Sequence, residues 1–109
     1  MSLKYQKPIN TGNNNVAIGY EALNANSTAD ANVGIGYQAL VVNSTGAGNI
    51  AIGYQAGDSI TTGTKNISIG YQTLFTSPAV RSYCTAVGFR ALYNFNGENN
   101  TAVGVEAAM

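Results

Sequence analysis

The chain has 109 residues, enough for a single domain, because ordinary domains run to about 100–200 residues. It contains no histidine and one cysteine, and its five basic and five acidic residues give no net charge. This composition excludes the usual zinc, haem and iron–sulfur ligand sets and the Ser-His and Cys-His nucleophile pairs, so neither a cofactor nor enzymatic activity is expected.

A nine-residue block recurs six times along the chain. The first copy, Asn15-Val-Ala-Ile-Gly-Tyr-Glu-Ala-Leu23, is followed by copies that begin at residues 32, 49, 66, 84 and 100. Spacers rich in Ser, Thr, Asn and Gly separate the copies and give a usual period of 17 residues. Residues 1–14 match the block poorly and are expected to be either an N-terminal capping segment or an expression scar. The repeat domain is therefore placed at residues 15–109.

Each copy is expected to begin with a short strand. The three residues before the block's glycine are mostly apolar or β-branched, as in Val16-Ala-Ile18, which favours a strand. The glycine then ends the strand, because it reaches a positive φ without a Cβ clash. The following Tyr-Gln-Ala-Leu stretch is expected to form a second short strand, so that one repeat makes one coil of a flattened β-solenoid. We therefore predict an all-β fold of about six coils that stack by parallel pairing at about 4.8 Å.

Stacking places equivalent residues of successive coils in ladders. A ladder of Asn side chains could bind a ligand or a cation, but hydrogen bonding among the stacked amides and with the turn backbone is the favoured interpretation. Cys84 occupies the Asn position of the fifth copy and is interpreted as a tolerated small residue rather than a reactive thiol. The predicted structural ladders comprise Asn15, Asn32, Asn49, Asn66 and Asn100; Gly19, Gly36, Gly53, Gly70, Gly88 and Gly104; and Ile18, Ile35, Ile52, Ile69, Val87 and Val103.

Both faces of the strand are small or apolar in nearly every copy of the block. Side chains alternate along a strand, so Val16 and Ile18 share one face while Ala17 lies on the other. The Ala17 row continues with Gly, Ala, Ser, Ala and Ala, which a solenoid standing alone in water would not need on its outer face. A thin coil suits these small residues inside and leaves the Val/Ile row for a subunit interface, although the reverse assignment also fits the alternation. The chain is therefore predicted to be an obligate oligomer.

Aromatic residues provide the candidate binding surfaces. A ladder at the position after the block's glycine would offer sugars a ribbon of stacked rings, but packing is the favoured interpretation. Its members are Tyr20, Tyr37, Tyr54, Tyr71 and Phe89. Residues in the spacers are better candidates, because function in repeat proteins concentrates in the variable loops. These candidates are Phe75, Arg81, Tyr83, Tyr93 and Phe95.

The block Asn-x-Ala-Ile/Val-Gly-x-x-Ala resembles the head repeats of YadA-like trimeric autotransporter adhesins, the haemagglutinin-type repeats, and its Tyr-Gln-Ala-Leu variant resembles repeats of phage tail-fibre proteins. The resemblance covers roughly residues 10–108. It implies a left-handed parallel β-roll with three chains around one axis, in a rigid segment of an adhesin head or tail fibre. It also implies an extracellular location, on a bacterial cell surface or a virion. The repeats here are longer than those of the adhesin heads, so their turns must differ.

The predicted partners are two further copies of the chain and a host-surface glycan or protein. Five basic residues provide no electrostatic footprint for a phosphate backbone, and no apolar run approaches the roughly 20 residues of a membrane-spanning helix, so neither nucleic acid nor membrane insertion is expected. Two alternatives are weaker. A trimeric left-handed β-helix acyltransferase would need a six-residue period and a histidine. An ice-binding solenoid would need regular threonine rows, whereas Thr28, Thr45, Thr61, Thr62 and Thr64 are expected to be scattered in the spacers.

Overall fold

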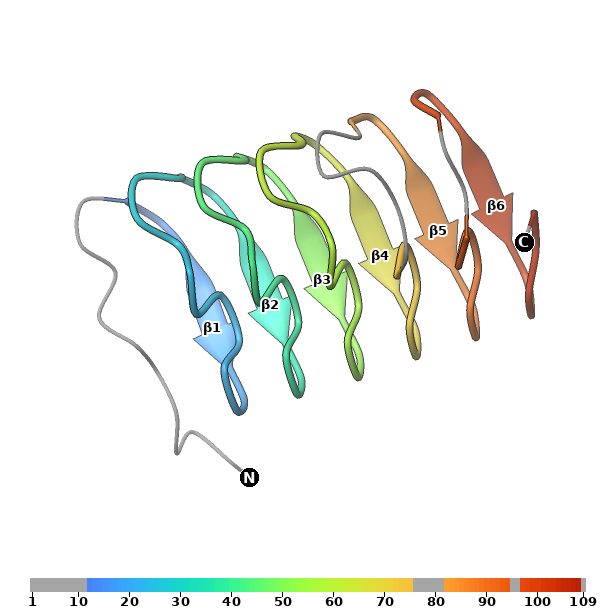
Figure 1. Cartoon of the computed structure of the whole chain (residues 1–109), viewed down its shortest axis with the longest axis horizontal. Helices are drawn as coiled ribbons and strands as arrows, with labels where there is room; N and C mark the ends of the chain where they lie inside the picture. Colours follow the sequence, from blue (N-terminus) through green and yellow to red (C-terminus); the bar gives the residue numbers. More distant parts are fainter. Residues whose placement is uncertain (1–11, 76–81, 95–96, 109) are drawn as a thin grey trace.

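The computed structural model describes residues 12–75, 82–94 and 97–108. Six three-residue strands pair in parallel and in chain order to form one sheet, and the chain winds into a β-solenoid of about five turns (Figure 1). The predicted all-β, parallel, stacked fold is confirmed. The strands are β1 (Val16–Ile18), β2 (Val33–Ile35), β3 (Ile50–Ile52), β4 (Ile67–Ile69), β5 (Thr85–Val87) and β6 (Thr101–Val103).

The register of the sheet follows the sequence repeat. Ala51 of β3 pairs with Gly34 of β2 and with Ser68 of β4, and every other strand residue also pairs with its equivalents in the adjacent coils. The 18-residue repeat between Gly70 and Gly88 leaves this register unchanged, since β4 and β5 still pair Ile69 with Val87. Any extra residue in a spacer is therefore accommodated outside the sheet.

The expectation of two strands per coil was wrong, because the described residues form one strand in each coil. The Tyr-Gln-Ala-Leu stretch is a turn in which alternate residues adopt the left-handed conformation. In the second coil, for example, Gln38 has a φ of 54° and Leu40 a φ of 52°. A strand requires negative φ at successive residues, so this alternation bends the chain sharply back across the coil.

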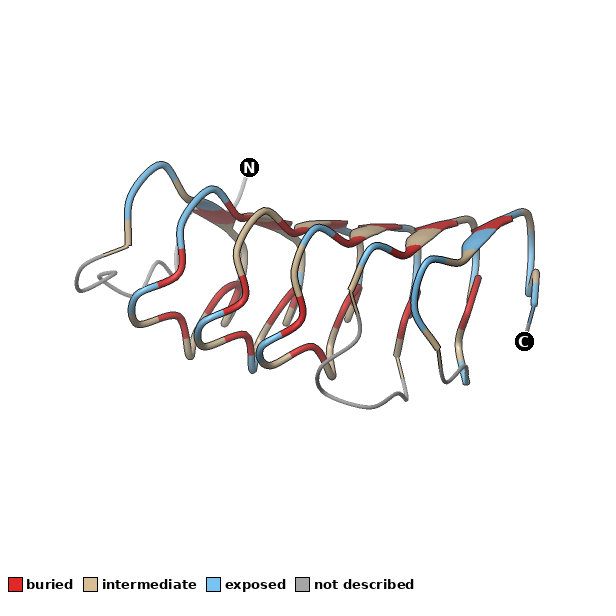
Figure 2. Cartoon of the chain, turned by 90° about the horizontal axis from the view of Figure 1, so that it is seen from above, coloured by how far each residue is buried: buried red, intermediate tan, exposed pale blue. Residues whose placement is uncertain are grey.

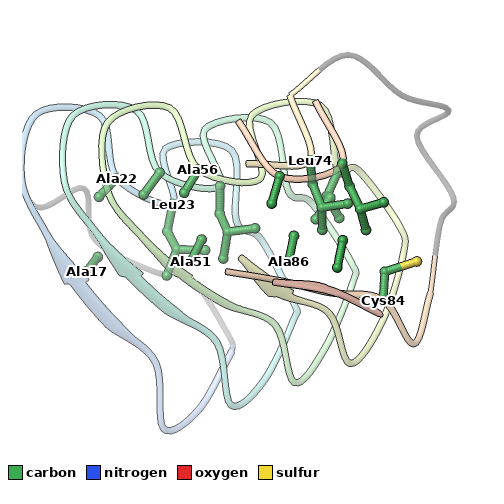
Figure 3. Close-up of a cluster of buried hydrophobic side chains, with 14 residues drawn as sticks. Ala17, Ala22, Leu23, Ala51, Ala56, Leu74, Cys84 and Ala86 are labelled. Atoms are coloured by element: carbon green, nitrogen blue, oxygen red, sulfur yellow. The ribbon is translucent and has the colours of Figure 1, made fainter. Parts of the chain in front are cut away.

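The interior of the coil contains the small side chains of the strands. The middle residue of every strand is buried, whereas the residues on either side of it point outward and are partly or largely exposed (Figure 2). Ala51 is fully buried, for example, while the adjacent Ile52 is 37% exposed. The interior is completed by leucines from the turns, such as Leu23 and Leu74, which lie across from the strand alanines (Figure 3). Of the two assignments that the sequence left open, the structure has the small row inside and the Val/Ile rows outside.

A glycine ladder fixes the spacing of the coils at the end of each strand. Gly53 has a φ of 132°, a region that side-chain-bearing residues rarely adopt. A Cβ built on Gly53 would lie 2.7 Å from the carbonyl oxygen of Gly70 in the next coil. Both the backbone conformation and the close approach of the coils therefore require glycine at this position.

Candidate interaction surface

The outer face of the sheet is uncharged and mostly apolar. The first and third strand residues of each coil point outward, and they are Val, Ile or, in β5 and β6, Thr at the first position. None of these residues carries a charge. Val16 and Ile69 are 43% and 37% exposed, whereas a soluble monomer usually places polar residues on the solvent face of a sheet. We call these two columns of side chains the strand face.

An aromatic column borders the strand face. Its residues follow the strand-ending glycines, so each ring lies only two residues along the chain from the third strand residue of its coil. Successive rings stack with centroids 4.9–5.3 Å apart and interplanar angles of 8–13°. Tyr54 is still 41% exposed. Because each inner ring has a neighbour on both of its faces, the exposed part of the column is mainly ring edge and hydroxyl. The column consists of Tyr20, Tyr37, Tyr54, Tyr71 and Phe89.

A polar column lies beside the aromatic column, one residue further along each coil. Gln38 Nε2 donates to Glu21 Oε1 at 2.8 Å, Gln55 Nε2 to Gln38 Oε1 at 3.0 Å, and Gln72 Nε2 to Gln55 Oε1 at 2.9 Å. The column continues to Arg90, whose Nε donates to Gln72 Oε1 at 3.2 Å. We call this set the polar column. The sequence analysis did not single it out, although its only signal, a polar residue recurring after the aromatic position, was present.

The middle of the Asn ladder lies inside the solenoid, while Asn15 and Asn100 at its ends are partly exposed. Asn32 is buried, and its Nδ2 donates to the turn carbonyl of Gly46 at 2.9 Å, while its Oδ1 accepts from the backbone N–H of Asn49 at 2.8 Å. Equivalent bonds recur at Asn15 and Asn49. Hydrogen bonding to the turn and to the next coil thus occupies the amides of Asn15, Asn32 and Asn49, whereas Asn100 Nδ2 donates within its own coil to the carbonyl of Glu98 at 2.7 Å.

Cys84 takes the Asn position in the fifth coil and is also buried. Its backbone N–H donates to Asn66 Oδ1 at 3.0 Å, as the backbone N–H groups of the ladder asparagines do in other coils. Its sulfur lies 3.4 Å from the turn carbonyl of Gly97, which corresponds to the carbonyls that accept from the Asn amides of other coils. The thiol therefore replaces a structural donor and has no exposed position from which to react.

The spacer residues predicted to bind a partner fall into separate groups. Phe75 and Tyr93 stack at 5.2 Å, and the Arg90 guanidinium lies over the Tyr93 ring at 4.7 Å and over the Phe89 ring at 5.4 Å. Tyr83 instead pairs with the Lys65 ammonium at 5.8 Å. Arg81 and Phe95 lie outside the described residues. The structure thus brings two of the five candidates together, and Arg90, which the sequence analysis did not name, joins them to the aromatic column.

Three of the five spacer threonines are aligned, which corrects in part the expectation that all five are scattered. Thr28, Thr45 and Thr62 occupy equivalent positions in successive coils, and all three are exposed. The residues before them are joined by backbone hydrogen bonds from Ser27 to Ser44 at 3.3 Å and from Ser44 to Thr61 at 2.9 Å. The exact spacing of 17 residues was the signal in the sequence.

Comparisons with models of protein families, with curated proteins and with solved structures found no match to this chain. Within the part of the chain that the structure describes, no three His, Cys, Asp or Glu residues are grouped closely enough to hold a metal ion. The same part of the chain contains no helix with the length and hydropathy needed to cross a membrane.

Proposed function

We propose that this domain is a rigid, non-enzymatic segment of a homotrimeric surface fibre that attaches to a host cell or surface, from an adhesin head or a tail fibre. On this proposal the protein is extracellular, at a bacterial surface or on a virion. The observation that carries the proposal is the uncovered strand face, which spans all six strands without a charge. A contiguous apolar surface that continues across a whole sheet is typical of a protein–protein contact.

The regularity of the strand face favours further copies of this chain as the partner. Equivalent side chains recur once per coil, at about 4.8 Å along the axis. A second molecule can pack against all six rows only if its own side chains recur at the same spacing, and another copy of the same solenoid does so. The resemblance to adhesin head repeats implies three copies. The same resemblance implies the role in attachment.

Light scattering with sedimentation equilibrium tests the assembly. The single chain has a mass of 11.3 kDa, and we expect the measured mass to be three times this value across a range of concentrations. A folded protein that sediments as a single chain at concentrations well above micromolar would contradict the proposal. The attachment role is tested separately on glycan arrays and on cells, with binding by the assembled protein as the supporting result.

A second candidate function, ice binding, is favoured by the exposed column of Thr28, Thr45 and Thr62. An assay of ice recrystallisation, run beside the glycan array, distinguishes it from attachment. The acyltransferase alternative has no such support, because the chain contains no histidine. Measurable acyl transfer would nevertheless overturn the non-enzymatic proposal.

A further inference from the structure

We propose that the aromatic column is part of the contact between copies of this chain, rather than a ribbon that binds sugars. This inference rests on the proposed assembly and extends it by naming which side chains beyond the strands are covered. The occupant of the aromatic column is thus a neighbouring copy of the same solenoid.

The position of the rings is the first argument. The aromatic position follows the end of the strand by two residues, with only the strand-ending glycine between them. Tyr54 and Ile52 are both exposed, at 41% and 37%, so the ring borders the outward row of its own coil, and the other coils repeat the arrangement. The strand face and the aromatic column form one surface whose members are aliphatic, aromatic or threonine side chains.

The borders of this surface are the second argument. On one side it meets the polar column, in which Gln38, Gln55 and Gln72 are hydrogen-bonded to one another. On the other side, before the strands, the equivalent positions are mixed: Asn14, Lys65 and Asn99 are exposed, and so are Ala31 and Tyr83. An apolar centre with a polar rim is the usual arrangement of a protein interface. The continuous polar column thus marks one edge of the contact, and the aromatic column lies on the inner side of that edge.

The stacking of the rings is the third argument. A sugar that binds an aromatic residue lies against the face of the ring, and the faces of Tyr37, Tyr54 and Tyr71 are covered by their neighbours at 4.9–5.3 Å. The edges remain open, and ring edges pack well against aliphatic side chains. The column is thus better suited to a protein surface of its own spacing than to a flat sugar.

The width of the surface is the fourth argument. Six three-residue strands present a projected area about 29 Å long and about 10 Å wide, which is small beside the roughly 800 Å² that each partner buries in a standard interface. The aromatic column widens the surface to about 16 Å. Inclusion of the rings thus raises the projected area from about 290 to about 460 Å², which brings the contact closer to the standard size than the strand face alone does.

Tryptophan accessibility tests this inference directly, because the natural chain contains no tryptophan. Tyr54 is 41% exposed and Val42, on the return segment of the preceding coil, is 40% exposed, so the two positions are matched in a single chain. We expect acrylamide to quench the fluorescence of the Val42→Trp variant several-fold more strongly than that of Tyr54→Trp in the assembled protein. When the assembly is dissociated, we also expect the emission of the Tyr54→Trp variant to shift to longer wavelength and that of Val42→Trp to stay unchanged.

Charge substitution provides a second readout. We expect Tyr54→Lys to weaken assembly by more than about 30-fold, as loss of a central contact residue does, and Val42→Lys to leave it nearly unchanged. If Tyr54→Lys fails to fold by circular dichroism, the conservative Tyr54→Trp measurement decides. Equal quenching at both positions in a protein that still has the mass of an assembly would overturn this inference alone. An added glycan that protects the Tyr54→Trp fluorescence from acrylamide quenching would also overturn this inference alone. A protein that is a single folded chain would overturn the proposed function as well.

Discussion

Gly53 and Gly104 occupy equivalent positions at the ends of β3 and β6 and have nearly the same φ, 132° and 128°. They differ in what lies above them. A Cβ on Gly53 would meet the backbone of Gly70, whereas the nearest atom to a Cβ on Gly104 is the Ala107 Cβ, at 3.9 Å. The pair therefore separates the cost of the backbone conformation from the cost of the close contact between coils.

We expect Gly104→Ala to lower the free energy of unfolding by about 1–3 kcal/mol, the cost of the unfavourable φ alone. We expect Gly53→Ala to lower it further, because its Cβ also disturbs the close contact between coils. Thermal unfolding followed by circular dichroism at one fixed protein concentration measures both variants. Equal decreases in the free energy of unfolding would mean that the coils move apart easily at this edge, so that only the backbone conformation requires glycine.

Burial raises the pKa of the Asp58 carboxyl above its ordinary value, 3.8. A raised pKa in the folded state means that folding favours the protonated form, so stability falls as the pH rises from 3.8 through the folded-state pKa. At neutral pH the ionised carboxylate is therefore destabilising. We expect Asp58→Asn to raise the melting temperature at pH 7 and to lose this advantage as the pH falls below about 4. Melting temperatures of both proteins across this pH range test the explanation, and an advantage of Asp58→Asn that does not depend on pH would contradict it.

At the scale of the coil, the third repeat departs from its neighbours in two coupled ways. Gly57 stands where the first two coils have Leu23 and Leu40, and Ile60 stands where they have an Asn. Ile60 is buried, and its Cδ1 would lie 3.3 Å from a Cβ built on Gly57, so it fills the volume that the missing leucine leaves. The departure has a polar consequence as well. Oδ1 of the buried Asn43, in the coil below, has no hydrogen-bond partner, because Ile60 supplies no donor there.

We expect the single variants Gly57→Leu and Ile60→Asn each to be destabilised, the first by crowding against Leu40 and Ile60, whose methyl groups would lie 3.0 and 3.3 Å from the new Cβ, and the second by a cavity beside Gly57. The double variant restores the pattern of the first two coils and gives Asn43 a donor, so its stability should return to that of the natural chain or exceed it. The double-mutant cycle should show a coupling of about 1–3 kcal/mol. Additive losses would show that the two positions do not compensate each other.

At the scale of the whole molecule, the two faces of the sheet have different environments. Ala51 and Ile52 are adjacent in β3, but Ala51 is buried within the coil and Ile52 is outward. The interior of one coil must stay apolar for the chain to fold, whereas the outer face must stay apolar only if another copy covers it. Charge substitutions at these two residues therefore separate folding from assembly.

We expect Ala51→Asp to abolish the folded solenoid, because an unpaired charge within the coil has no compensating partner. We expect Ile52→Asp to leave a folded single chain that no longer assembles. Circular dichroism measures the first effect and light scattering the second. An Ile52→Asp variant that assembles normally would show that this part of the strand face is not covered.

The sequence by itself determined the repeat, and with it the strands, their parallel order and their register. The reason is that a repeat with glycine at one fixed position can stack only on its own equivalents, so Gly19 to Gly104 mark the coils without any knowledge of distant contacts. The ladders of Asn and aromatic residues also follow from the period alone.

Only the tertiary structure decided which face of the strand lies inside. Alternation places Ala51 and Ile52 on opposite sides but does not say which side is enclosed, because both rows are apolar. That depends on how sharply the chain returns. The left-handed residues after the strand, such as Gln38 and Leu40, make the coil so thin that only the small row fits within it. The same sharp return replaced the expected second strand and left the strand face and the aromatic column on the outside, where a partner would be needed to cover them.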